Sequence, residues 1–116
     1  MEIKYNTMIV SDMEKSVKYY TENLGFKVEE VFNLGPNQII LLKSKGNTML
    51  ELIDNKDFDV GFYSIGMEVD DLDKTVKDLK DKGIEFLLEP VKITVGKMAK
   101  IKDPNGVIIV LLEHTK

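Results

Sequence analysis

The sequence predicts an α+β fold made of two tandem βαβββ modules. Two observations carry this prediction: the order strand, helix, strand, strand, strand occurs twice, and residues 8–18 match residues 67–77 in register. Met, Val, Asp, Lys and a second Val recur in both segments at one constant offset. Any two capped amphipathic helices look somewhat alike, but a match that spans strand, cap and helix is typical of a duplicated unit. We therefore expect a single domain over 1–116, with module one at 1–54, a linker at 55–60 and module two at 61–116.

Module one begins with an apolar strand over residues 3–10. Ser11-Asp12 then supplies a helix N-cap, and apolar residues at helical spacing predict a helix over 13–23 that Gly25 ends. The apolar helix positions are Met13, Val17, Tyr20 and Leu24. Three strands follow at 26–34, 38–44 and 48–54, because turn-forming Gly, Pro and Asn residues separate them.

Module two repeats this order after the polar linker. A strand is expected at 62–69, and Asp70-Asp71 caps a helix that runs to Lys82 and ends at Gly83. Strands are expected at 84–89, 95–102 and 107–113, with Pro90 separating the first two and a turn at 103–106 before the last.

The composition excludes several classes of protein. The chain has 116 residues, 16 basic residues that are all lysine, 20 acidic residues, one histidine and no cysteine, and its formal net charge is −4. Without cysteine there is no disulfide, iron–sulfur or thiol chemistry. Without arginine, recognition of nucleic acid is not expected. No apolar run approaches the length of a membrane span and no signal-peptide core precedes the first strand, so we expect a cytoplasmic protein with no membrane partner.

Several segments together resemble one known family. They are 10–16 with Tyr19-Tyr20, 24–26, 49–52, 68–73 and the Asp-Pro-Asn-Gly turn at 103–106. In this order and at this spacing they resemble the glyoxalase/bleomycin resistance protein/dioxygenase superfamily, also called the vicinal oxygen chelate superfamily. The resemblance implies curled mixed sheets around a cup that holds the ligand. It also implies a homodimer, in which modules are often exchanged between partners.

The resemblance implies four positions for metal ligands, two in each module. A histidine usually lies seven residues before the Asp cap, and these positions hold Tyr5 and Ser64 here. A carboxylate usually lies in the last strand of each module, and these positions hold Glu51 and Val110. Glu51 is the only retained family position, and two hydroxyls with a valine are poor ligands for Zn, Ni or Fe. We therefore expect no metal and no other cofactor.

Strand alternation predicts which residues face the ligand. The predicted ligand-binding residues are Tyr5, Thr7, Met49, Glu51, Phe62, Ser64, Glu68, Ile108 and Val110. A mostly apolar wall with a few polar groups is typical of a small-molecule site. For the aliphatic residues, an ordinary buried strand explains the pattern equally well.

Two individual residues leave alternatives open. Glu51, between two leucines, is either a ligand contact or a solvated carboxylate at a sheet edge. His114 is either a stand-in ligand or a terminal surface side chain.

These residues favour a metal-free protein that binds a small molecule, such as an antibiotic or a metabolite, with no catalytic residue assigned. One alternative is a metal-dependent lyase, isomerase or dioxygenase that uses Glu51 with unconventional ligands and has lactoylglutathione-lyase-like or dioxygenase-like activity. The other alternative is metal-free acid–base catalysis by Glu51.

Overall fold

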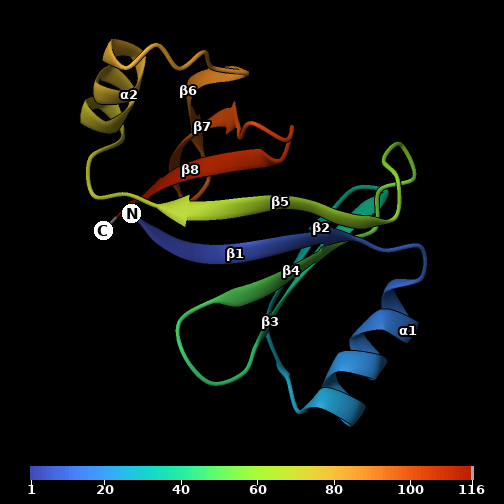
Figure 1. The fold of residues 1–116 in the computed structure, drawn as a ribbon. Coiled ribbons are helices and arrows are strands. Elements are labelled where there is room, and N and C mark those ends of the chain that lie inside the picture. The colour runs from blue at the N-terminus through green and yellow to red at the C-terminus, as the bar shows by residue number, and fades with distance from the viewer. Residues whose placement is uncertain (116) are drawn as a thin grey trace. The chain divides into compact units, whose positions relative to one another are not determined.

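The computed structural model describes residues 1–115, and within them the chain divides into two compact units. Residues 5–63 form the first half, and residues 1–4 together with residues 64 onward form the second half. Both boundaries fall inside strands: most of β1 (Glu2–Ile9) lies in the first half and most of β5 (Gly61–Glu68) in the second. Each half has one helix region and four strands in the same order. Figure 1 shows the labelled helices and strands. The prediction of an α+β fold built from βαβββ modules is confirmed.

The first half contains five main elements. Its strands are β1 (Glu2–Ile9), β2 (Lys27–Leu34), β3 (Asn37–Lys43) and β4 (Met49–Ile53), and its helix is α1 (Met13–Lys18). The strands are arranged in the order β2-β3-β4-β1, with β1 parallel to β4 and the other neighbours antiparallel.

The helix of the first half differs from the predicted continuous α-helix. Asp12 caps α1 as expected, because its side chain accepts a hydrogen bond from the Lys15 N–H. After Lys18 the backbone widens into a π-helix, η1 (Tyr19–Asn23), and the Thr21 hydroxyl donates to the Val17 carbonyl. Met13 is buried as predicted, whereas Leu24 is half-exposed.

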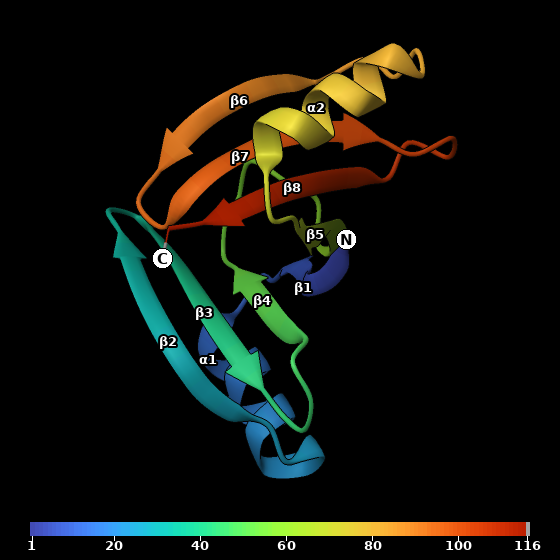
Figure 2. The same cartoon turned by 90° about the vertical axis from the view of Figure 1, so that its left-hand side faces the viewer.

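The second half repeats the topology. Its elements are β5 (Gly61–Glu68), α2 (Leu72–Asp81), β6 (Leu88–Ile93), β7 (Gly96–Lys102) and β8 (Ile108–His114). The strands are arranged as β5-β8-β7-β6, with β5 parallel to β8, and Figure 2 shows the curled strands β6, β7 and β8 side by side with α2. Asp71 caps α2 as predicted, through a bond from the Lys74 N–H.

The strand predicted at 84–89 is present, but its bounds are wrong, because β6 runs over Leu88–Ile93. Ile84 and Phe86 pack against the core from the connection after α2, so their apolar character reflects burial without strand pairing. Pro90 lies inside β6 and does not precede it. This edge strand tolerates proline because its pairing with β7 shifts register between Leu88 and Val91.

Each half has its own apolar core between its helix and one face of its sheet. In the first half Met13 packs with Ile40, Leu42 and Leu52. The core of the second half contains the following residues: Val69, Leu72, Val76, Ala99, Ile101 and Leu111. Neither helix within residues 1–115 has the length and apolarity that crossing a membrane requires.

Candidate functional site

The helix-distal face of the first sheet, the face opposite α1, carries a partly buried polar pair. Thr7 on β1 and Glu51 on β4 lie directly across from each other in the parallel pairing. The Thr7 Oγ1 atom donates a hydrogen bond of 2.6 Å to Glu51 Oε1. Thr7 is only 3% exposed, so this donor has little access to water. The pair fixes the position of one carboxylate oxygen.

Burial changes the acidity of this carboxyl group. Desolvation raises the pKa of Glu51 above its ordinary value, and the hydrogen bond from Thr7 acts in the opposite direction. Leu41 on β3, itself buried, lies across from Glu51 on its other side. Glu51 is therefore held in an apolar strand environment and differs from a solvated carboxylate at a sheet edge.

Other predicted residues of the first half share this face. Tyr5 and Met49 lie across from each other, two residues before Thr7 and Glu51 on the same two strands. The structure therefore brings together Tyr5, Thr7, Met49 and Glu51. Phe62, at the start of β5, is half-exposed, as a residue available for contact would be.

The predicted residues of the second half share the helix-distal face of their own sheet. Ser64 lies across from Ile108, and Gly66 lies across from Val110, in the parallel pairing of β5 with β8. Ser64 is buried, with 2% of its surface exposed. At the positions that correspond to Thr7 and Glu51, this half has Gly66 and Val110, and neither side chain has a polar group.

A polar pair nevertheless occurs further along the same two strands. His114 is the last residue of β8, and its Nδ1 atom contacts Oε2 of Glu68, the last residue of β5, as an ion pair when the imidazole is protonated. Of the two interpretations left open for His114, the structure shows a half-buried side chain at the end of β8 that contacts Glu68, and it does not test a role as a ligand. The available signal was that His114 has the same strand parity as Val110 and Leu112.

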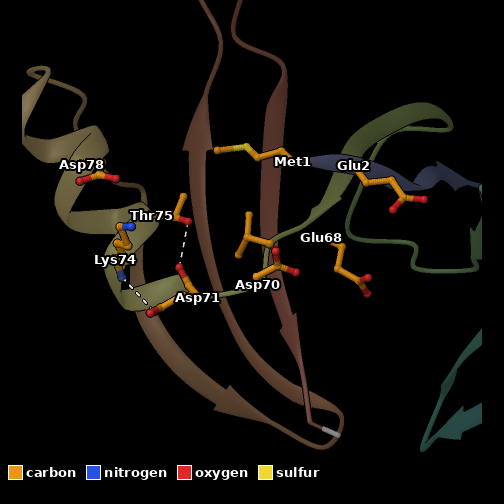
Figure 3. A pocket seen from close by; sticks show the side chains of 9 residues that line it. Met1, Glu2, Glu68, Asp70, Asp71, Lys74, Thr75 and Asp78 are labelled. Atoms are coloured by element: carbon orange, nitrogen blue, oxygen red, sulfur yellow. Dashed lines mark hydrogen bonds between the residues drawn. The ribbon is translucent and has the colours of Figure 1, made fainter.

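Glu68 also lines a pocket of about 550 Å³ between the end of β5 and the first turns of α2. Figure 3 shows Asp71, Lys74, Thr75 and Asp78 on the helix side and Glu2 beside Glu68. Asp71 is engaged as the α2 cap, and its carbonyl accepts from the Thr75 hydroxyl. This pocket is lined mainly by carboxylates, which sequence periodicity did not predict because its residues come from a strand end, a helix and the N-terminus.

The four family positions do not make a conventional metal site. Tyr5 and Ser64 offer neutral hydroxyls, Val110 offers no donor, and only Glu51 is a carboxylate. One carboxylate does not balance a divalent cation, and Oε1 of Glu51 already accepts a hydrogen bond from Thr7. Across residues 1–115, no group of three or more His, Cys, Asp or Glu side chains is arranged to hold a metal ion. The donor set does not fit the metal that the family resemblance implies.

Fold and sequence together define the class of protein. The profile of the glyoxalase/bleomycin resistance protein/dioxygenase superfamily matches residues 2–111, and the chain belongs to this superfamily. A probable chloroplastic lactoylglutathione lyase of Arabidopsis thaliana is 34% identical over 90% of this chain, which spans only 33% of that protein. The mitochondrial methylmalonyl-CoA epimerase of Homo sapiens is 30% identical over 94% of this chain and 72% of its own length.

A solved structure supports the same fold. The crystal structure of methylmalonyl-CoA epimerase from Mycobacterium tuberculosis matches with a TM-score of 0.86, over 99% of this chain and 89% of that one. The sequence identity is 18%, so this likeness concerns the fold alone.

Proposed function

We propose that the protein binds a small organic molecule on the helix-distal face that carries Thr7 and Glu51, without a conventional metal centre. The hydrogen-bonded Thr7–Glu51 pair carries this proposal. A carboxylate in an apolar strand is costly unless a partner compensates for its lost hydration. Thr7 donates to one carboxylate oxygen of Glu51. A ligand that supplies a cation or a further hydrogen-bond donor would compensate for the lost hydration of the other oxygen.

The neighbouring residues support an aromatic or otherwise apolar body on this ligand. Tyr5 and Met49 lie beside the polar pair, and both side chains have a large contact surface. The Tyr5 ring can stack on an aromatic ligand, and the flexible Met49 side chain can adapt to the ligand's shape. A cationic or hydrogen-bond-donating aromatic molecule, such as an antibiotic or a metabolite, therefore fits the chemistry of this face.

Calorimetric titration tests this proposal. The wild-type chain and the variants Glu51→Gln, Thr7→Val and Glu14→Gln are titrated with a panel of cationic aromatic compounds. Glu14 is an exposed carboxylate on α1, so its variant controls for the change in net charge. We expect binding that Glu51→Gln weakens about tenfold or more, because hydrogen bonds to a charged group contribute about 1.5–3 kcal/mol. Equal affinities of the Glu51 and Glu14 variants would contradict the proposal.

The metal-dependent alternative has its own test. Purified protein is offered Zn²⁺, Ni²⁺, Mn²⁺ and Fe²⁺ separately, then dialysed and analysed for bound metal. We expect no stoichiometric metal, because the donor set lacks imidazole and a second carboxylate. One metal ion per chain that disappears in Glu51→Gln would instead support a metal-dependent lyase, isomerase or dioxygenase.

A second candidate function is proton transfer by Glu51, and the raised pKa of this group favours it. A carboxyl group whose pKa lies closer to neutrality accepts and returns protons more effectively near neutral pH. Two of the relatives are named as an epimerase and a lyase. Methylmalonyl-CoA in D₂O is a suitable probe, with deuterium incorporation followed by mass spectrometry. Incorporation that persists at an unchanged rate in Glu51→Gln would exclude Glu51 as the base.

We also propose a cytoplasmic homodimer that binds neither nucleic acid nor membranes. The family resemblance supports the dimer, and the absence of arginine argues against nucleic-acid recognition. Light scattering on the purified chain measures the mass directly, and a monomer mass at micromolar concentration would contradict the dimer.

A further inference from the structure

The helix-distal face of the second sheet carries a lysine among apolar residues. Lys100 lies on β7, and its two neighbours in the chain pack with α2 in the core, so alternation places Lys100 on the opposite face. Val110 of β8 and Leu88 of β6 lie directly across from Lys100, one on each side. Gly66 of β5 lies across from Val110 in the same row. Lys100 is half-buried, and none of these three neighbours has a polar side-chain group.

The first module has a buried leucine at the corresponding position. At the constant offset that relates the modules, Lys100 corresponds to Leu41, which is 7% exposed and lies across from Glu51. The packing of the module therefore does not require a cation at this position. Residues that depart from the burial pattern of their fold position are expected mainly at functional sites. Lys100 is thus a candidate functional residue of the second half.

The carboxylates of the second half do not neutralise Lys100. On the other face of β7, Lys97 Nζ lies 3.2 Å from Asp73 Oδ2 and 3.7 Å from Glu113 Oε2. Within residues 1–115, the Lys100 ammonium group makes no such ion pair and no hydrogen bond. Glu68 shares its face of the sheet, but the Glu68 carboxylate contacts the single histidine. A half-buried charge without a partner loses hydration that no contact restores, so an anion from outside the chain would stabilise it.

We propose that Lys100 binds the oxyanion, a carboxylate or a phosphate, of a small molecule whose apolar part lies against Val110 and Leu88. Lysine binds either oxyanion, because its ammonium group is a compact charge with three rotatable donors. Met98, two residues before Lys100 on the same face, adds a flexible apolar surface. This proposal goes beyond the function proposed above, because it concerns the other half of the chain and the opposite ligand charge. It does not depend on Glu51.

Titration of the ¹⁵N-labelled full chain, followed by ¹H–¹⁵N NMR spectra, tests this proposal with three probes that share one aromatic ring. Benzoate carries a carboxylate, phenyl phosphate carries a phosphate, and benzamide is a neutral analogue of benzoate. We expect both anions to shift the backbone amide signals of β7 and β8, and benzamide to bind about tenfold more weakly than benzoate. Binding of either anion supports the proposal, and the tighter of the two identifies the oxyanion. Equal affinities for benzoate and benzamide, or no shift with either anion at about 10 mM, would overturn it.

Two lysine variants assign the binding to this side chain. Lys100→Met keeps the apolar stem and removes the charge, and Lys100→Leu introduces the residue that the first module has at this position. Lys82→Met, at an exposed lysine that ends α2, is the matched control because it changes the net charge equally. We expect both Lys100 variants to weaken benzoate binding about tenfold and Lys82→Met to bind as the wild type does. Equal affinities of the Lys100 and Lys82 variants, with circular dichroism showing them folded, would refute the assignment to Lys100.

Discussion

Replacing Thr7 by Val tests the buried polar pair of the first half directly. Valine preserves the branched shape of threonine and removes only the hydroxyl that donates 2.6 Å to Glu51 Oε1. Thr7 is 3% exposed, so water has little access to replace the lost donor. Hydrogen bonds to charged groups contribute about 1.5–3 kcal/mol, and because Glu51 is only partly buried we expect a loss of about 2 kcal/mol at neutral pH.

The pH dependence of this loss has a definite sign. The bond from Thr7 favours the charged carboxylate and so lowers the pKa of Glu51 against the larger effect of burial, which raises it. The bond from Thr7 to the charged carboxylate therefore adds to the free energy of unfolding above the Glu51 pKa, and this extra stability is lost as the pH falls through that pKa. Below that pKa the carboxyl is neutral, and the loss should decrease to about 1 kcal/mol, the contribution of a neutral hydrogen bond.

Urea unfolding of the wild type and Thr7→Val from acidic to neutral pH measures both quantities. Glu51→Gln is the companion variant, since burial makes the charged form of Glu51 unfavourable. Relative to this variant, the wild type is most stable below the ordinary carboxyl range and loses stability as the pH rises through the raised Glu51 pKa. A loss in Thr7→Val that is below about 0.5 kcal/mol, the lower limit for a typical hydrogen bond, and independent of pH would refute this reasoning.

Three further predictions, made with four substitutions, test the fold by thermal or urea unfolding. Gly96→Ala should lower the free energy of unfolding by about 3 kcal/mol, because the φ of Gly96 is +151° and a Cβ atom there would lie 1.9 Å from the Glu113 carbonyl oxygen. Gly35→Ala, which has open space around it, should lower it by about 1 kcal/mol. Equal losses in the two variants would contradict the clash at Gly96. Asp71→Ala should cost about 1 kcal/mol through the lost α2 cap, and unchanged stability would argue against that cap. Leu111→Ala should cost about 3 kcal/mol, since Leu111 is fully buried, and a loss under 1 kcal/mol would contradict its place in the core.

The sequence predicted most of the fold because helix caps, turns and apolar periodicity each depend on residues that are close together in the chain. Asp12 and Asp71 cap their helices as the pattern indicated, since a cap depends on a few neighbouring residues. The strand predicted at 84–89 begins only at Leu88, because apolar residues in a sequence indicate burial without indicating pairing, and Ile84 and Phe86 are partly buried outside any strand. The π-helical turn at Tyr19–Asn23 has the same side-chain periodicity signal as an α-helix over so short a stretch, so the pattern did not predict it.

The part of the candidate site that the sequence could predict is the sheet face on which each strand residue lies, because strand alternation alone determines it. Parity placed Thr7 and Glu51 on one face, but only the register of β1 with β4 puts them directly across from each other. The contact of Glu68 with His114 depends on β8 continuing to His114, beyond the predicted strand end at residue 113. Pairings between strands distant in sequence are tertiary information, which residue spacing within one strand does not contain.

The duplicated architecture explains why the two polar pairs lie at different levels of their sheets. At the constant offset that relates the modules, Thr7 and Glu51 correspond to Gly66 and Val110, and both couples lie across from each other in parallel strands. The second module therefore has no polar pair at this level. Its own pair lies further toward the strand ends, where Glu68 takes the position of Ile9 and His114 that of Asn55.

This divergence has a chemical consequence. In the first half a hydroxyl donates to a carboxylate whose pKa burial raises, whereas in the second half a carboxylate contacts an imidazole at the strand ends. Two copies of one scaffold thus present an acid and a base at non-equivalent positions, each held by a partner from the parallel strand. If the Thr7–Glu51 pair acts only within its own half, Glu68→Ala should leave the pH dependence of the stability loss in Thr7→Val unchanged. A change in this pH dependence would show that the two pairs are coupled.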